Sequence, residues 1–175
     1  MYEIFFSNDN TQLHIAVIQG DVAKIIRLLE EGADIEARNV FGNTPLHEAG
    51  VFGHSEVITT LIKNKAVVNA RNNMEETPLH LAAGADNCSA ITILIDNGAD
   101  INAKDQDGNT PLHSAVNPFA YDAVNTLLNK GADAKATNIF DFLPIKVVSM
   151  GRGTITEIEQ KRIDEALKRL RDASY

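Results

Sequence analysis

Apolar residues recur along the chain at the spacing of short amphipathic helices. Between residues 55 and 64, apolar side chains fall at the i, i+3 and i+4 positions that share one face of a helix. These positions are Val57, Ile58, Leu61 and Ile62. The stripe returns at Ile25, Ile26, Leu28 and Leu29, at Ile91, Leu94 and Ile95, and at Val124, Leu127 and Leu128. Each stripe predicts a short helix with one buried face.

A shorter helix is predicted just before the one at residues 55–64. Thr44 is a favourable N-cap, because its hydroxyl can accept a hydrogen bond from a free backbone N–H of the first turn. Pro45 falls at the first helical position, where a missing N–H has no consequence. We therefore predict a helix from Pro45 to about Phe52 that ends at Gly53, so that the local unit is helix, turn, helix.

A period of 33 residues relates these units. Thr-Pro-Leu-His tetrads begin at Thr44, Thr77 and Thr110 without any insertion. One period earlier the chain reads Thr11-Gln12-Leu13-His14, and one period later it reads Leu143-Pro144-Ile145-Lys146. A second motif keeps the same register, at Gly32-Ala33-Asp34-Ile35, Lys65-Ala66-Val67-Val68, Gly98-Ala99-Asp100-Ile101 and Gly131-Ala132-Asp133-Ala134. Such a period predicts stacked units with atypical units at the ends.

The sequence resembles the ankyrin repeat family, whose 33-residue unit carries T-P-L-H-x-A. The His-x-Ala part recurs at His14-Ile15-Ala16, His47-Glu48-Ala49, His80-Leu81-Ala82 and His113-Ser114-Ala115, and the fifth unit departs with Lys146-Val147-Val148. The resemblance implies an all-α solenoid of stacked helix-turn-helix units with hairpin tips. One helix pair has too little apolar area to form a core by itself, so neighbouring units must stack.

We expect one ankyrin-repeat domain over residues 1–175. Its parts are an N-terminal flank with the first repeat at 1–39, repeats at 40–72, 73–105 and 106–138, and a C-terminal capping repeat at 139–175. The capping repeat differs from the others, because the pattern from Thr154 to about Asp172 predicts one longer helix with a charged outer face. No definite structure is predicted for residues 1–10.

Glycine ends most of the second helices. Gly32, Gly98 and Gly131 share the position that follows a helix in the left-handed conformation, which suits a residue without a Cβ atom. Lys65 stands at this position in the second unit. A non-glycine residue in left-handed geometry costs roughly 1 kcal/mol, so we predict local strain at Lys65.

Composition and charge narrow the functional classes. The 175 residues are 44% apolar, which fits one globular domain, and the net charge of -8 disfavours nucleic acid and anionic lipid as partners. No apolar run approaches the ~20 residues that span a bilayer, and the first ten residues lack a signal-peptide core, so we expect no membrane contact and an uncleaved chain. Cys88 is the single cysteine and cannot close an internal disulfide, which favours a reducing compartment. We expect a monomer in the cytoplasm, or in a host cytosol if the chain comes from an intracellular bacterium.

The histidines and the cysteine do not predict metal binding or catalysis. Stacked helices lie ~8–10 Å apart, whereas ligands ~2.1 Å from one zinc ion lie within roughly 4 Å of one another. The resemblance implies that His14, His47, His80 and His113 hydrogen-bond across a turn, and that His54 is structural. Cys88 has no basic residue or histidine within six positions to lower its pKa. We expect no metal, no cofactor and no enzymatic activity.

Candidate binding residues remain once the residues that the fold requires are set aside. The resemblance places them on a concave face, at the hairpin tips and at the ends of the first helices. They are Arg38, Val40, Phe41, Asn43, Val51, Phe52, Arg71, Asn73, Met74, Glu76, Lys104, Gln106, Asp107, Asn109, Asn117, Ile139, Phe140 and Phe142. Exposed aromatic side chains are typical of binding anchors. We expect Phe41, Phe52 and Met74 to form one apolar patch.

Acidic residues are concentrated in the third and fourth units. Residues 72–145 carry ten acids and three bases, whereas residues 1–71 carry nine acids and six bases. This excess should attract a basic partner, although solubility alone also accounts for it. We interpret the chain as a non-catalytic adaptor or inhibitor of another protein. The alternatives are a chaperone-like or structural scaffold for one partner enzyme, and a small-molecule or metal-dependent enzyme built on the stack.

Asn102 is a candidate modification site. Leu94, five further residues and then Asp100-Ile101-Asn102 resemble the site at which an asparaginyl hydroxylase modifies ankyrin repeats. The alternative interpretation is an ordinary asparagine of a hairpin loop.

Overall fold

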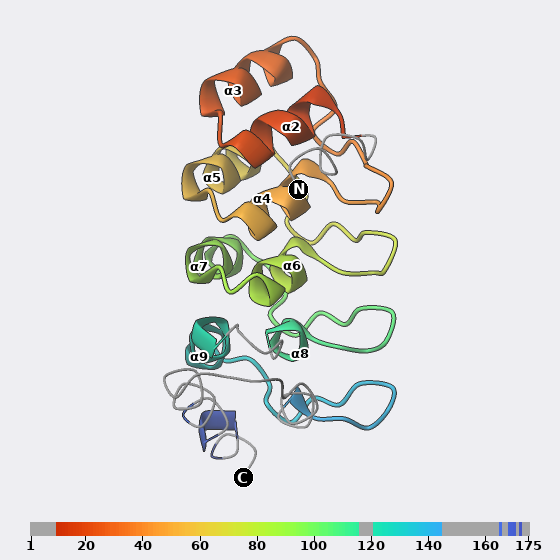
Figure 1. The fold of residues 1–175 in the computed structure, drawn as a ribbon, viewed down its shortest axis with the longest axis vertical. Helices are drawn as coiled ribbons and strands as arrows, with labels where there is room; N and C mark the ends of the chain where they lie inside the picture. The colour runs from red at the N-terminus through yellow and green to blue at the C-terminus, as the bar shows by residue number, and fades with distance from the viewer. Residues whose placement is uncertain (1–9, 116–120, 145–164, 166–167, 171, 173–175) are drawn as a thin grey trace, which may run out of the picture.

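The computed structural model describes residues 10–115, 121–144, 165, 168–170 and 172. Pairs of antiparallel helices are stacked along one axis, and each pair is followed by a loop that projects from the same side of the stack (Figure 1). The pairs are α2 (Gln12–Gln19) with α3 (Val22–Glu30), α4 (Pro45–Phe52) with α5 (Ser55–Lys63), α6 (Pro78–Gly84) with α7 (Cys88–Asp96), and α8 (Pro111–Ser114) with α9 (Tyr121–Asn129). No strand occurs among these described residues, and the predicted all-α solenoid is confirmed.

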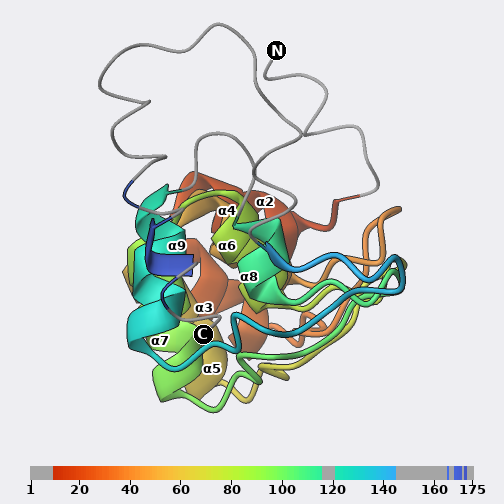
Figure 2. The same ribbon diagram turned by 90° about the horizontal axis from the view of Figure 1, so that it is seen from below.

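The helices form two layers. In the inner layer, beside the projecting loops, α4 packs between α2 and α6 (Figure 2). In the outer layer, α5 packs between α3 and α7. The inner helices and the loops together form one face of the stack, which we call the concave face.

Local sequence sets the ends of the helices. Thr44, at the N-cap of α4, has extended backbone, and Pro45 occupies the first turn. The helix ends at Gly53, whose φ of 71° is left-handed. The predicted bounds of α4 are therefore confirmed, and α5 ends at Lys63, one residue before the predicted end.

Left-handed residues also end the outer helices, as the repeat predicted. Gly32, Gly98 and Gly131 have φ of 91°, 91° and 93°, and Lys65 has φ of 74°. A Cβ atom added at any of the three glycines would meet nothing within 4 Å. The strain at Lys65 therefore comes from its own backbone rather than from crowding at this position.

The core runs through the stack between the two layers. Each inner helix contributes one leucine that is at most 1% exposed, and the outer helices contribute β-branched residues and further leucines. The leucines of the inner helices are Leu13, Leu46, Leu79 and Leu112. Full burial of such a side chain is worth roughly 1.5–3 kcal/mol, so every helix pair depends on the neighbours that cover it.

One expected core residue is exposed. Ile26 of α3 was expected in the buried stripe, but 43% of its surface is accessible. Counted from the buried Ile25, the i+3 and i+4 positions are Leu28 and Leu29. Ile26 is at i+1 and therefore lies outside this stripe. The other units have the polar residues Thr59, Thr92 and Asn125 at this position, and all three are half-buried.

The predicted C-terminal helix lies largely outside the described residues. Residues 165, 168–170 and 172 are helical, and Leu170 is fully buried. Arg169 donates a hydrogen bond of 2.6 Å from Nη2 to Oδ1 of Asn129, at the end of α9. These residues therefore contact the fourth helix pair.

Candidate functional site

Each of the four repeated histidines links its inner helix to the loop of the next unit. In the second unit, the backbone N–H of Thr44 donates to Nδ1 of His47 over 3.1 Å, and the Thr44 hydroxyl lies 2.9 Å from the same nitrogen. Because Nδ1 accepts a hydrogen bond, Nε2 carries the proton and donates it to the Glu76 carbonyl over 3.0 Å. His14, His80 and His113 reach the carbonyls of Asn43, Asn109 and Phe142 in the same way. The predicted hydrogen bond across the turn is confirmed.

Burial keeps these histidines neutral. Desolvation lowers the pKa of all four, and the hydrogen bond from Nε2 to a carbonyl offsets only part of this effect. It lowers the pKa of His47 to about 4. His54 has a different structural contact, with Nε2 3.2 Å from the Ile18 carbonyl of the preceding unit. Within the described ranges, no three His, Cys, Asp or Glu side chains are placed to hold a metal ion.

An Asn or Asp side chain closes each projecting loop. In the loop between α3 and α4, Oδ1 of Asn39 accepts hydrogen bonds from the backbone N–H groups of Phe41 and Asn43, at 3.0 and 3.1 Å. Asn72, Asp105 and Asn138 do the same one, two and three periods later. Such side-chain bonds to the backbone define a turn without a regular strand.

Neighbouring loops are also joined to one another. The backbone N–H groups of Asn73, Gln106 and Ile139 each donate to a carbonyl of the preceding loop, at 3.0 to 3.1 Å. Loop tips that are each closed internally and bonded to the next tip have few ways to move independently. The side chains that they carry are therefore held at fixed spacing.

The predicted basic binding residues have contacts within the stack. Arg38 donates from Nη1 to the carbonyl of Arg71 over 2.5 Å, and Arg71 donates from Nη1 to the carbonyl of Lys104 over 2.7 Å. Lys104 continues the series, with Nζ 3.0 Å from the Thr137 carbonyl. These exposed side chains tie successive loops together, a role that sequence reasoning did not assign to them.

Large apolar side chains are exposed at the loop tips. Phe41 is 54% accessible and Met74 50%, and Val40 lies beside them. Ile139 and Phe140, on the loop that follows α9, are at least as exposed, and the ring centroids of Phe140 and Phe142 lie 6.2 Å apart. The loop that follows α7 carries polar residues at its tip, so the apolar tips fall into two groups.

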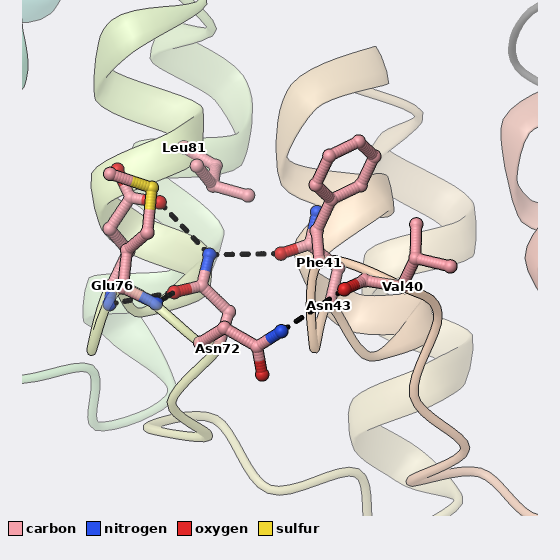
Figure 3. Close-up of a pocket in the computed structure, with 8 residues that line it drawn as sticks. Val40, Phe41, Asn43, Asn72, Glu76 and Leu81 are labelled. Carbon is pink, nitrogen blue, oxygen red and sulfur yellow. Dashed lines mark hydrogen bonds between the residues drawn. The ribbon is translucent and has the colours of Figure 1, made fainter. Parts of the chain in front are cut away.

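A hollow of about 300 Å³ opens between the loop that follows α3 and the loop that follows α5. It is lined by Val40, Phe41, Asn43, Asn72, Asn73, Met74, Glu76 and Leu81 (Figure 3). All of these except Asn72 and Leu81 are among the binding residues expected from the sequence, and their role in binding stays a prediction. Leu81 of α6 corresponds to Glu48 one period earlier and to Ser114 one period later. This change from apolar to polar side chains was the available signal that the position lies outside the hydrophobic core.

Phe52 does not join this hollow, which corrects the expected patch of Phe41, Phe52 and Met74. Phe52 is the last residue of α4 and is half-buried, as is Val51 beside it. The hollow borders the middle of an inner helix, because Leu81 corresponds to Glu48 in α4. Phe52 lies four residues beyond Glu48, about 6 Å further along the helix axis.

A chain of amide and carboxylate groups forms the floor of the hollow and continues beside it. Nδ2 of Asn72 donates to Oδ1 of Asn43 and to Oε2 of Glu76, at 2.9 Å each (Figure 3). Nδ2 of Asn43 and of Asn39 both donate to Oε1 of Glu48, at 3.0 Å. Glu48 is only 7% exposed, and sequence reasoning did not identify it as part of this face.

The remaining predicted positions lie elsewhere. Asn109 forms side-chain hydrogen bonds with Asp105 and Asn138. At the tip of the loop that follows α7, Gln106 is exposed and Asp107 is half-buried. Asn117 lies outside the described residues. Asn102 is exposed, and its Oδ1 accepts a hydrogen bond of 2.9 Å from the backbone N–H of Asp133. Its hydroxylation stays a prediction.

Comparisons with known proteins identify one family. A family model described as ankyrin repeats (3 copies) matches residues 2–72 and again residues 68–138. A search of curated proteins gives no match. In the part of the chain that the structure describes, no helix is both long and apolar enough to cross a membrane.

Proposed function

The chain belongs to the ankyrin repeat family, whose members are generally non-catalytic modules for protein–protein interaction, and we propose that it is an adaptor or inhibitor that binds a partner protein on its concave face. The observation that carries this proposal is the exposure of Phe41 and Met74 on loops that are bonded to one another. The fold gains nothing from exposing these side chains. An interface would bury them.

The loops favour tight binding because they are already ordered. Binding to a flexible loop costs the entropy of ordering it, whereas a preorganised surface avoids most of that cost. Interfaces commonly take most of their energy from a few buried aromatic or large apolar anchors. Phe41 and Met74 form one such anchor group, and Ile139 with Phe140 forms a second.

The charge distribution supports a basic partner. Between residues 72 and 145 the chain carries ten acids and three bases. Of those bases, Lys104 is bonded to a loop carbonyl and Lys130 to Asp96, at 3.0 and 2.6 Å. An acidic surface raises the rate at which a basic protein associates with it.

We place the chain in the cytoplasm, as a monomer. Cys88 is its single cysteine and is a free, half-buried thiol, which is compatible with a reducing compartment. Sedimentation of the purified chain would test the monomeric state.

Comparative capture from cells tests the binding face. The wild-type chain and the double variant Phe41→Ala, Met74→Ala are used as baits in parallel, and the bound proteins are quantified. We expect at least one protein to be retained by the wild type and lost from the double variant. The control is Ile26→Ala, which removes an exposed apolar side chain from α3, away from the concave face. If both baits retain the same proteins, the proposed face is wrong.

A further inference from the structure

The polar groups around the hollow leave hydrogen-bond acceptors in excess. Both N–H groups of the Asn72 amide are donated, one to Asn43 and one to Glu76. One N–H of Asn43 goes to Glu48, and one of Asn73 goes to the Val40 carbonyl. The donors of the lining are therefore largely used within the fold, whereas two carboxylates face or adjoin the hollow.

Glu76 offers an accepting atom at the hollow. Its Oε2 accepts from Asn72, and its Oε1 accepts no hydrogen bond from any described residue. The carboxylate is half-buried, so a charge brought to it is less screened than on open surface. The hollow therefore suits a side chain that donates hydrogen bonds and is positively charged.

Apolar side chains make up half of the residues that line the hollow. Val40, Phe41, Met74 and Leu81 line it, and Phe41 and Met74 are half exposed in the free chain. A long aliphatic stem or a flat cation would cover these side chains. Arginine combines both properties, since it carries a hydrocarbon stem, stacks on aromatic rings and is more weakly hydrated than lysine.

We infer that the partner places an arginine side chain in this hollow, with its guanidinium group on the Glu76 carboxylate and its stem against Phe41 and Met74. The inference rests on the proposed function and names the chemistry that the concave face recognises there. An acidic side chain would meet Glu76 and the neighbouring Glu48, and an aliphatic one would leave Oε1 of Glu76 desolvated without a donor. The hollow is large enough for one side chain, so flanking residues of the partner would contact the loop tips outside it.

Selection from a phage-displayed library of random dodecapeptides tests this inference without a known partner. The full chain is immobilised as wild type, as Glu76→Gln and as Glu75→Gln. Glu75→Gln is the matched control, because Glu75 is the adjacent carboxylate, pairs with Arg71 at the exposed tip and does not line the hollow. We expect arginine to be enriched in peptides selected on the wild type and on Glu75→Gln, and not on Glu76→Gln.

Affinities of the best wild-type peptide complete the test. Glu76→Gln in the chain and Arg→Gln in the peptide should each weaken binding at least tenfold, and the two changes together should cost little more than either one. The peptide substitution is measured on the wild-type chain, so it gives an answer even if Glu76→Gln were to destabilise the fold. Peptides that need Phe41 and Met74 but show no dependence on arginine or Glu76 would overturn this inference and leave the proposed function standing. If no peptide distinguishes the wild type from the double variant Phe41→Ala, Met74→Ala, this inference and the proposed function would both be contradicted.

Discussion

Single residues in unusual conformations show how closely the repeat register controls this chain. Lys65 adopts left-handed backbone because it stands where the other units have Gly32, Gly98 and Gly131. Its backbone N–H donates to the Ile62 carbonyl and that of Ala66 to the Leu61 carbonyl, and the same pair of hydrogen bonds ends the other outer helices. The neighbouring units hold the helix end in place, and the cost of the left-handed geometry remains in the folded state.

Replacing Lys65 by glycine should therefore stabilise the protein. We expect Lys65→Gly to raise the free energy of unfolding by up to about 1 kcal/mol, since glycine adopts this φ without strain. For a chain of this size that corresponds to a melting temperature higher by roughly 2–4 °C. Lys65→Ala is the control, because it removes the same side chain and retains the strained Cβ atom. Equal melting temperatures for the two variants would contradict the explanation by backbone strain.

The buried His47 should make stability depend on pH. Burial lowers its folded pKa to about 4 from 6.5, so the unfolded chain takes up the proton first as the pH falls. Stability present above pH 6.5 is therefore lost as the pH falls toward 4. Between pH 7 and 5.5, His47 should remove about 1.2 kcal/mol from the free energy of unfolding. Urea unfolding at both pH values measures the loss, which should be smaller by that amount in His47→Gln. If His47→Gln left the pH dependence of stability unchanged, the explanation by the buried His47 would be contradicted.

At the scale of elements, the helices could be predicted from sequence more fully than the loops. Thr44, Pro45 and Gly53 fixed the ends of α4, because capping depends on residues within one turn. Glu48 and Phe52 belong to the same helix, yet their environments were not predicted. Glu48 accepts hydrogen bonds from amides of the neighbouring loop, which a pattern within one helix does not reveal. The exposed Phe41 and Met74 were found because no repeat motif requires them.

The loops should owe their shape to the Asn or Asp that closes each one. Asn72 accepts two backbone hydrogen bonds and donates to Asn43 and Glu76, and it is buried. We expect Asn72→Ala to lower the free energy of unfolding by roughly 2 kcal/mol, because two backbone N–H groups lose their acceptor and Asn43 and Glu76 lose a donor. The neighbouring Asn73→Ala removes one exposed hydrogen bond and should cost less than about 1 kcal/mol. Denaturant unfolding of both variants checks the prediction, and equal losses would contradict it.

At the scale of the whole molecule, the stack combines apolar side chains exposed at the loop tips with an acidic excess between residues 72 and 145. The acidic excess between residues 72 and 145 should act over longer range than the apolar tips, which act only on contact. Charge is therefore expected to affect the rate of association, and the apolar anchors the rate of dissociation.

Salt should separate these two contributions. With a basic partner, raising the ionic strength from about 0.05 to 0.5 M shortens the Debye length from roughly 14 Å to about 4 Å and should slow association about tenfold. The dissociation rate should change much less. Stopped-flow mixing or surface plasmon resonance gives both rates. An association rate that does not fall with salt would mean that the partner is not attracted by charge.

The central claim is that Phe41 and Met74 anchor a partner protein. Its most direct test is the dissociation constant of the purified partner, measured by isothermal titration calorimetry with the wild type, Phe41→Ala, Met74→Ala and the off-face control Ile26→Ala. We predict that each of the two face variants binds at least tenfold more weakly, about 1.4 kcal/mol, with a melting temperature close to that of the wild type. Ile26→Ala should bind as the wild type does. Wild-type affinity in both Phe41→Ala and Met74→Ala would contradict the account.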